Sequence, residues 1–393
     1  MKIVKHTILL LLITLSTQSW ADTPFSAPQK SKKQENIQVL LNKDIPEVLL
    51  EVKGPYYVYD PLDHSKISSG LFGKRYIIRA TKSGIKWGEE FPGIHQIFIA
   101  PRSTETSILV NGIQYDGAVA IYKVGNRINV VNELSVENYI KSILTTTITT
   151  PFDTEVLAAI AIAARTTAYY YAIKHQNAFW HINATDVGYQ GMALLTPNSS
   201  IVKAVDSTKN LILVHPQEGK NLPFVATWNE HSAGATAPYH VVFRKDDQAP
   251  KDIVKAPLAA LDRKESKWNT TLLKQQVANA LNLKKIENIE LYVDKQSGKT
   301  YAVRIKTEED TQDMDFLKFQ EKLGKNVIQS NDLSVSIIDN KISFSGYGTG
   351  HGVGLCLYSA SAMAQNGDIA VKILSKFFPE TFLINLSAIP NIN

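Results

Sequence analysis

The sequence predicts an α+β protein with a β-rich N-terminal half, a central alanine-rich helix and a Gly/His loop near the C-terminus. Short apolar runs separated by Gly, Pro, Asp and Asn fill residues 36–131, a pattern typical of consecutive strands. A long alanine-rich segment spans residues 149–175, and glycines alternate with other residues over 346–354. We expect the loop to fold back beside the helix, so that the two together form one extended groove.

The first 35 residues are expected to lie outside this fold. A basic start, an apolar run at residues 8–15 and small residues before Asp22 are typical of a signal peptide spanning residues 1–21. The polar, Pro-bearing segment 22–35 predicts a flexible lead-in. Eight apolar residues are too few to cross a bilayer. We therefore expect a soluble exported protein with no stable membrane anchor after signal cleavage.

Composition narrows the class of protein. Apolar residues make up 44% and charged residues 20% of the 393 residues, which supports a packed globular core. The formal net charge of +5 is mildly basic; it would help at an anionic wall or membrane surface but identifies no partner, and we expect no nucleic-acid partner. Cys356 is the only cysteine, which excludes an internal disulfide and a cysteine-rich zinc site. We expect no metal and no cofactor.

Residues 36–131 should form the β-rich part of the fold. Eight apolar runs lie in this range, and the Asn111-Gly112 pair between two of them is a strong signal for a β-hairpin.

Residues 132–200 should form the helical core. The segment "LSVENYIKSIL" has helical apolar spacing. In the next segment Thr150, Pro151 and Asp153 predict a capping-box start with proline at the first helical position. The helix that follows is apolar nearly all round, so we expect it to be buried.

Residues 201–345 look mixed. They contain helical stretches at 272–283 and 314–324 and several alternating runs typical of strands. Residues 346–388 carry the glycine run and then one or two short helices. All of residues 36–388 are expected to form one domain.

The glycine run surrounds His351. Glycine permits positive φ and close backbone approach, so the loop could line a groove in which His351 is a polar tip. A tight turn with a structural histidine explains the same pattern, and the residues alone leave the two open.

Four segments together resemble the SpoIID/LytB family, the stage II sporulation protein D and amidase-enhancer group of bacterial cell-wall proteins. They are "GYGTGHGVGLCLYSASAMAQNG", "AAIAIAARTTAYYYA", "VATWNEHSAGATA" and the stretch from "VNGIQYDG" to "ENYIKSI". The resemblance runs from about residue 36 to 388. It implies peptidoglycan glycan strands as the substrate and a periplasmic or cell-wall-associated location; active members are lytic transglycosylases and others enhance wall amidases.

A lytic transglycosylase needs only one carboxylic acid, because the nucleophile is a hydroxyl of the sugar itself. The resemblance implies that this acid lies eight residues before Glu155, where the present chain has Thr147. Tyr139 and Arg165 match the family on either side. A threonine hydroxyl is far too weak an acid to protonate a leaving group near neutral pH.

Two functions follow. The chain either binds glycan strands without cleaving them, as a non-catalytic binder or amidase enhancer, or it is a lytic transglycosylase with a displaced acid. Thr147 favours the first. Glu230 is the best substitute acid, because its neighbour His231 lies in a turn expected to approach the groove. The other candidate acids are Glu155, which is expected to cap its helix, Glu137 and Glu133.

The expected substrate-binding residues are His351, Gly350, Gly352, Tyr347, Tyr358, Arg165, His231 and Ser232. Tyr347 and Tyr358 suit a sugar platform. Arg165 lies in an apolar helix, so an ion pair is its favoured role and a sugar contact the alternative. A metal site built from Glu230, His231, His240 and His351 is chemically conceivable, but their spacing does not require one. The expected partners are glycan strands, with a wall amidase as a second candidate.

Overall fold

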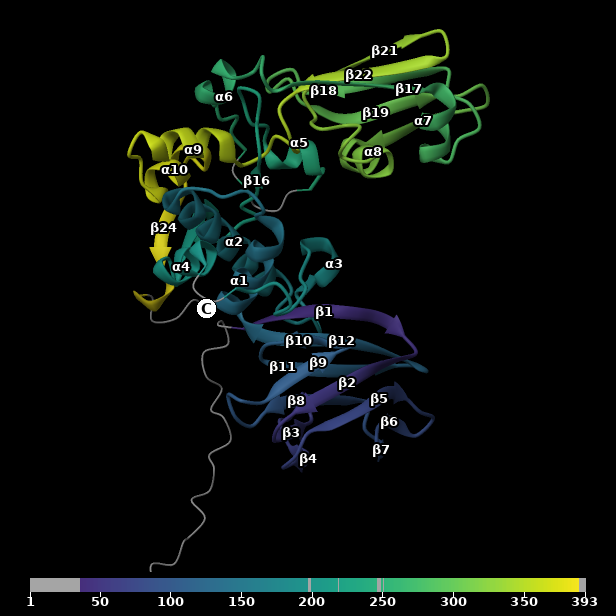
Figure 1. Ribbon diagram of the computed structural model, residues 1–393, viewed down its shortest axis with the longest axis vertical. Coiled ribbons are helices and arrows are strands. Elements are labelled where there is room, and N and C mark those ends of the chain that lie inside the picture. The colour runs from purple at the N-terminus through teal and green to yellow at the C-terminus, as the bar shows by residue number, and fades with distance from the viewer. Residues whose placement is uncertain (1–35, 197–198, 218, 246–248, 250, 389–393) are drawn as a thin grey trace, which may run out of the picture. The chain divides into compact units, whose positions relative to one another are not determined.

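Figure 1 shows the computed structural model, in which the N-terminal half is rich in strands. The structure describes residues 36–196, 199–217, 219–245, 249 and 251–388. The predicted signal peptide at 1–21 and lead-in at 22–35 lie outside the described residues. Strands and helices are mixed along the chain, which confirms the predicted α+β class.

Two sheets make up the β-rich part. A seven-stranded sheet has the order β13-β1-β12-β11-β8-β3-β4, and a six-stranded sheet has the order β10-β9-β2-β5-β6-β7. The strands are β1 Asn36–Ile45, β2 Glu47–Lys53, β3 Tyr56–Tyr59, β4 Lys66–Gly70, β5 Lys74–Ala80, β6 Gly84–Trp87, β7 Glu89–Pro92, β8 Gln96–Pro101, β9 Ser107–Val110, β10 Ile113–Tyr115, β11 Ala118–Val124, β12 Arg127–Ser135 and β13 Ile182–Asn183.

The predicted Asn-Gly hairpin is confirmed between β9 and β10. Asn111 and Gly112 have φ values of 50° and 82°, the left-handed conformations that a tight hairpin turn of this kind requires. Alternate side chains of both sheets face a shared apolar core; Trp87 is fully buried there and donates from Nε1 to the carbonyl of Leu50 at 3.1 Å.

Two helices follow the sheets, α1 Val136–Thr147 and α2 Thr154–Lys174. The buried face of α2 includes most of its alanines, which confirms the predicted burial. The predicted start was wrong in detail: Asp153 is the N-cap, its side chain accepts a hydrogen bond from the backbone of Glu155 at 2.8 Å, and Pro151 precedes the helix. By length and composition α2 could cross a membrane, but 78% of its most apolar window is buried inside the structure.

The C-terminal helices return to α2, as Figure 1 shows for the yellow segments. Helices α9 and α10 both pack against it, and so do α4 and β14. The elements of this layer are α4 Ser200–Ser207, β14 Leu211–Gln217, β15 Lys220–Leu222, α9 Leu357–Gln365, α10 Ala370–Phe377, β24 Phe382–Asn385 and a 3-10 turn at Leu386–Ala388. The short helix α3 Ala184–Val187 packs instead beside β1 and β13.

Residues 267–347 form what we call the inserted lobe, which has a hydrophobic core of its own. Two three-stranded sheets, β17-β22-β21 and β18-β19-β20, enclose Phe316, Phe319 and Phe344 together with two helices. Its elements are β17 Lys267–Leu273, α7 Lys274–Leu281, β18 Asn288–Val293, β19 Thr300–Lys306, β20 Thr311–Asp315, α8 Phe316–Leu323, β21 Leu333–Ile338 and β22 Lys341–Tyr347. The sequence indicated both helices and several of the strands but not this separate core.

Short elements join the lobe to the helical core. Strand β16 runs parallel to β23, and the glycine run lies between β22 and β23. These elements are β16 Trp228–Asn229, α5 Tyr239–Phe243, α6 Pro257–Leu261 and β23 Leu355–Cys356.

Candidate functional site

A groove of about 460 Å³ opens where three segments meet: the approach to α2, the turn after β16, and the outer face of α9. We call it the α9 groove. Its lining residues are Thr150, Phe152, Glu230, His231, Leu357, Tyr358, Ser361, Ala362 and Gln365. Of the predicted site residues, the groove brings together Glu230, His231 and Tyr358.

Backbone pairing explains why these segments meet. Strand β23 pairs with β16 and leads directly into α9. At the start of α9 the backbone N–H of Tyr358 donates to the carbonyl of Glu230 at 2.9 Å. The glutamate and the tyrosine are therefore held at adjacent points of one groove wall, although 128 positions separate them in the sequence, counted from their numbers.

His231 is the most constrained of the three residues. It is 9% exposed, and its ring lies 4.7 Å from the Tyr358 ring. Its Nδ1 accepts a hydrogen bond from the backbone of Ala233 at 3.0 Å, so the proton of the neutral ring is on Nε2. Nε2 lies 3.7 Å from Oδ2 of Asp262. Burial lowers the pKa of His231, and the carboxylate of Asp262 only partly opposes that shift.

The sequence analysis did not single out Asp262. The residue follows α6 and has no recognisable motif around it, so only the fold brings it to His231. The only sequence feature that Asp262 shows is its place in a polar segment before the inserted lobe, which does not indicate a contact with His231.

His351 is not among the residues that line the α9 groove, although the adjacent Gly350 packs beside Asn229 and Glu230. Its Nδ1 accepts from the backbone of Val353 at 3.1 Å, and its ring meets Phe243 edge-on at 5.1 Å. Burial lowers the pKa of His351 to about 4, despite a backbone hydrogen bond involving Trp228 that favours the charged form. This geometry favours the structural alternative, in which the histidine stabilises the loop.

The glycines of this loop allow close packing against protein. A Cβ on Gly348 would lie 2.3 Å from the carbonyl oxygen of His231, and one on Gly354 would lie 2.2 Å from that of Thr227. The predicted ligand contacts Gly350 and Gly352 are also engaged: Gly350 donates to the carbonyl of Gln329, and the carbonyl of Gly352 accepts from Ala237.

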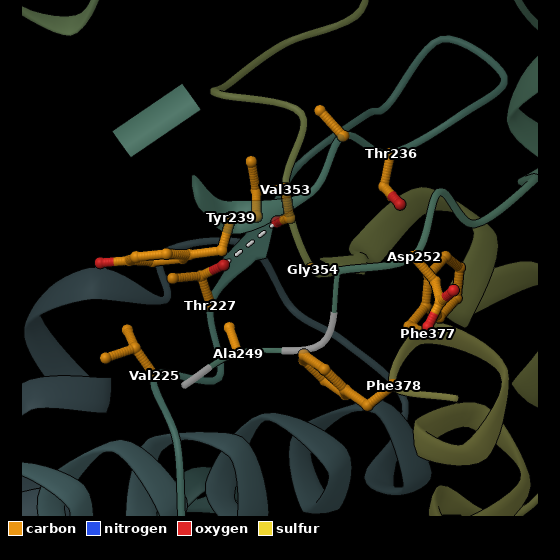
Figure 2. Close-up of a pocket in the computed structure, with 11 residues that line it drawn as sticks. Val225, Thr227, Thr236, Tyr239, Ala249, Asp252, Val353, Gly354, Phe377 and Phe378 are labelled. Atoms are coloured by element: carbon orange, nitrogen blue, oxygen red, sulfur yellow. Dashed lines mark hydrogen bonds between the residues drawn. The ribbon is translucent and has the colours of Figure 1, made fainter. Parts of the chain in front are cut away.

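Figure 2 shows a second, much smaller cavity, which is lined in part by Val353 and Gly354 at the end of the glycine run. Thr227 donates to the carbonyl of Val353 at 3.3 Å on one side, and Phe377 and Phe378 close the other. Its volume of about 20 Å³ suits about one water molecule. It is too small for a ligand larger than that, so the α9 groove is the candidate binding site.

Thr147, the position implied for the family acid, is the last residue of α1. Its hydroxyl donates to the carbonyl of Ile143 at 2.8 Å, and it does not line the α9 groove. Among the hydrogen bonds of the described residues, none joins a carboxylate to Thr147. Glu155 caps α10, because its Oε2 accepts from the backbone of Ala370 at 2.7 Å. Glu133 accepts hydrogen bonds from Asn36 and Gln38 near β1.

Arg165 and Glu137 form a buried ion pair. Arg165 is fully buried, and its Nε and Nη2 donate to the two carboxylate oxygens at 2.9 and 2.8 Å. Further bonds run to the carbonyls of Val205 and Leu211. Arg165 is part of the core, the Glu137 side chain is 16% exposed, and neither residue lines the groove.

The inserted lobe is bonded to the turn that carries His231. Lys299 is 2% exposed and donates to the carbonyl of Ser232 at 2.7 Å and to Asp332 at 3.1 Å. Arg263 makes two bonds to Asp332, at 2.7 and 3.0 Å, and donates to the carbonyl of Ala233. Loops of the lobe thus determine the position of one groove wall.

The remaining predicted residues lie close to this connection. The ring of Tyr347 stacks under the Arg263 guanidinium at 4.1 Å. Ser232 is 1% exposed, and its hydroxyl has no hydrogen-bond partner among the described residues. Over the same part of the chain, no three His, Cys, Asp or Glu side chains lie close enough to hold a metal ion.

Comparison with known proteins supports the relationship that the motifs suggested. Residues 124–215 match the family described as SpoIID, stage II sporulation protein. An uncharacterized protein of Chlamydia pneumoniae is 32% identical over 222 residues, covering 55% of this chain and 81% of the relative. One from Chlamydia muridarum is 36% identical over 191 residues, or 48% and 66% of the two chains.

A longer match reaches an uncharacterized protein of Brachyspira hyodysenteriae, which is 28% identical over 340 residues, covering 84% of this chain and 88% of the relative. The matched segment 124–215 contains α1 and α2 and ends in β14, the packed centre of the helical core. The chain therefore belongs to the SpoIID family, and its SpoIID domain indicates a role related to the cell wall.

Proposed function

We propose that the protein binds peptidoglycan glycan strands in the α9 groove and does not cleave them, acting as a wall-binding protein or an amidase enhancer. The observation that carries this proposal is the groove itself, which combines aromatic and hydrogen-bonding side chains beside the core of the SpoIID domain.

The lining suits a sugar polymer. Tyr358 is 38% exposed, and an aromatic ring with one accessible face packs well on the apolar face of a sugar. Thr150, Ser361 and Gln365 place hydroxyl and amide groups along the same groove, where they can replace the water bound to sugar hydroxyls. The volume of about 460 Å³ falls within the usual range for ligand sites.

The non-catalytic form of the proposal rests on Thr147. The hydroxyl at this position is already donated to a backbone carbonyl, and it has no acidity near neutral pH. Binding without cleavage therefore needs no further assumption about the site.

The test is a pull-down with purified cell-wall sacculi and with isolated glycan strands. Tyr358→Ala should weaken binding about fivefold, because loss of one stacked ring costs on the order of 1 kcal/mol. Tyr76→Ala is the matched control, since Tyr76 is 55% exposed on β5 and away from the groove. Equal binding by both variants would remove the groove from the proposal.

A lytic transglycosylase is the second candidate, favoured by the exposed carboxylate of Glu230 in the groove. It predicts anhydro-muramyl ends after incubation with glycan strands, abolished by Glu230→Gln and retained by Glu309→Gln, a distant exposed control. Absence of such ends with binding intact would leave the non-catalytic proposal. Stimulation of a wall amidase by the wild type, lost in Tyr358→Ala, would identify an enhancer.

A further inference from the structure

The loop between β4 and β5 presents two large apolar side chains to water. Leu71 is 68% exposed and Phe72 is 83% exposed. The loop crosses from the seven-stranded sheet to the six-stranded sheet. Single exposed apolar residues need no explanation, whereas neighbouring ones that form a patch mark an interaction surface. The pair therefore calls for a partner that accepts apolar groups.

Neighbouring loops hold this loop in place at one end of the two sheets. The hydroxyl of Thr106 donates to the carbonyl of Pro55 at 2.8 Å, and the backbone N–H of Arg102 donates to the same carbonyl at 3.0 Å. A Cβ on Gly73 would lie 2.7 Å from the carbonyl oxygen of Val52, so the β4–β5 loop lies directly beside the end of β2. We call residues 53–55, 71–73 and 102–106 together the β tip.

The charge around the β tip is mainly positive. Its exposed cations are Lys53, Lys66, Arg75 and Arg102. Lys53 and Arg75 share a single carboxylate, that of Glu51, at 3.9 and 3.4 Å. Within the three loops Glu105 is the one acidic residue. Lysine and arginine stems are long enough to keep their charges at a polar surface while the apolar residues beside them enter it.

The aromatic ring of Tyr57 gathers two of these cations beside the tip. Lys66 and Arg102 lie 5.0 and 5.4 Å from its centroid, within the range of a cation–π contact. Lys74 is bonded to Glu89, so that pair adds no net charge. The cations thus outnumber the acidic groups around the two apolar side chains.

A second exposed leucine shows that this combination is particular to the β tip. Leu62 is 78% exposed in the turn between β3 and β4. That turn is at the other end of the hairpin, because Tyr56 pairs with Gly70. Leu62 lies between Asp60 and Asp63, which an anionic surface would repel. An exposed leucine therefore occurs in both acidic and basic surroundings, and only the β tip suits an anionic partner.

We propose that the β tip docks on an anionic phospholipid bilayer, with Leu71 and Phe72 inserted among the headgroups and the surrounding cations on lipid phosphates. Apolar side chains gain free energy by leaving water, and each basic residue near an anionic bilayer adds attraction. Two inserted side chains give reversible attachment, because interfacial binding scales with the apolar area buried. Strands β3 and β4 lie on the side of the β-rich part away from α1 and α2 (Figure 1). The inference does not depend on the proposed glycan binding.

Flotation of the full-length chain with phosphatidylglycerol or phosphatidylcholine vesicles measures the partition coefficient. The wild type should bind phosphatidylglycerol vesicles about tenfold more tightly, and added salt should weaken this binding. Leu71→Ser combined with Phe72→Ser should lower it about thirtyfold. Arg102→Gln should lower it about fivefold. Leu62→Ser is the matched control and should leave it unchanged.

A fluorescent side chain reports on the β tip directly, whichever other segment of the chain touches lipid. Phe72→Trp should emit at shorter wavelength with phosphatidylglycerol vesicles and should be quenched by brominated lipid, because an indole at a bilayer surface lies at headgroup level. Leu62→Trp should show neither change.

Each outcome supports or overturns the proposal. Equal binding of neutral and anionic vesicles, or no quenching of Phe72→Trp, overturns the anionic bilayer as the partner. Wild-type affinity of the double serine variant for vesicles overturns the role of the β tip. Loss of sacculus binding in that variant, with no vesicle binding by the wild type, would assign the tip to the wall instead. If the double variant does not fold, Phe72→Ser alone should lower vesicle binding about fivefold. Absence of vesicle binding leaves glycan binding in the α9 groove untouched.

Discussion

The buried pair between Arg165 and Glu137 gives the sharpest test of the helical core. Arg165 is fully buried and makes two short bonds to Glu137 and others to the carbonyls of Val205 and Leu211. Arg165→Met removes the cation and leaves the largely buried carboxylate of Glu137 without its charged partner. Breaking a buried pair in this way costs about 3–5 kcal/mol, and the carbonyls left without donors add to the loss.

Urea denaturation of the wild type, Arg165→Met, Glu137→Gln and the double variant measures this cost. The double variant should be less destabilised than the sum of the single variants by about 1–3 kcal/mol, because the second change removes the group that the first left unpaired. Lys284→Met is the control, since Lys284 belongs to an exposed pair with Glu309 and should cause no measurable change.

Sacculus binding in the same variants separates the structural role from a sugar contact. Arg165→Met should bind sacculi normally under conditions in which it remains folded. A loss of stability below about 1 kcal/mol together with a loss of binding would refute the structural interpretation and restore the sugar contact.

Three further predictions concern the helix ends, the glycine run and pH. Glu155→Gln should destabilise the protein by about 1 kcal/mol in thermal melts, because the carboxylate that accepts the N–H of Ala370 loses its charge; an unchanged melting temperature would contradict the cap. Gly354→Ala should lower the free energy of unfolding by more than about 2 kcal/mol in urea titrations, because the added Cβ would lie 2.2 Å from a carbonyl oxygen. Gly367→Ala is the control: this glycine also has a positive φ but has open space around it, so the loss should be about 1 kcal/mol. Equal losses in the two variants would show that the close contact at Gly354 does not matter. Burial lowers the pKa of His351 from 6.5 to about 4, so the stability that the neutral ring contributes is present above pH 6.5 and is lost as pH falls from 6.5 towards 4. His351→Gln should flatten this part of the curve of unfolding free energy against pH. An unchanged slope would contradict the burial of the ring.

Local patterns predicted elements wherever the signal lies within a few residues. The Asn111-Gly112 hairpin forms as predicted, because two successive residues in the left-handed conformation are compatible with few other turn types. The alanine-rich segment is a buried helix, because a helix that is apolar on every side is not stable when it is exposed to water. The helix start was wrong by three residues, because Thr150, Pro151 and Asp153 all carry start signals and only the folded chain selects Asp153.

Long-range partners could not be predicted in the same way. Nothing near Glu137 indicates that it pairs with a buried arginine, and nothing near Asp262 indicates that it lies beside His231. The inserted lobe likewise reads as a mixed stretch, because a separate core depends on which apolar faces meet.

The sequence by itself determined the α+β class, the buried alanine-rich helix and, through four motifs, the relationship to the SpoIID family, since each depends on residues close together in the chain. Only the tertiary structure decided that Glu230, His231 and Tyr358 share a groove while His351 and Arg165 do not line it. The physical reason is that strand pairing and burial join segments more than 100 residues apart in the numbering, and no local pattern encodes which of them will meet.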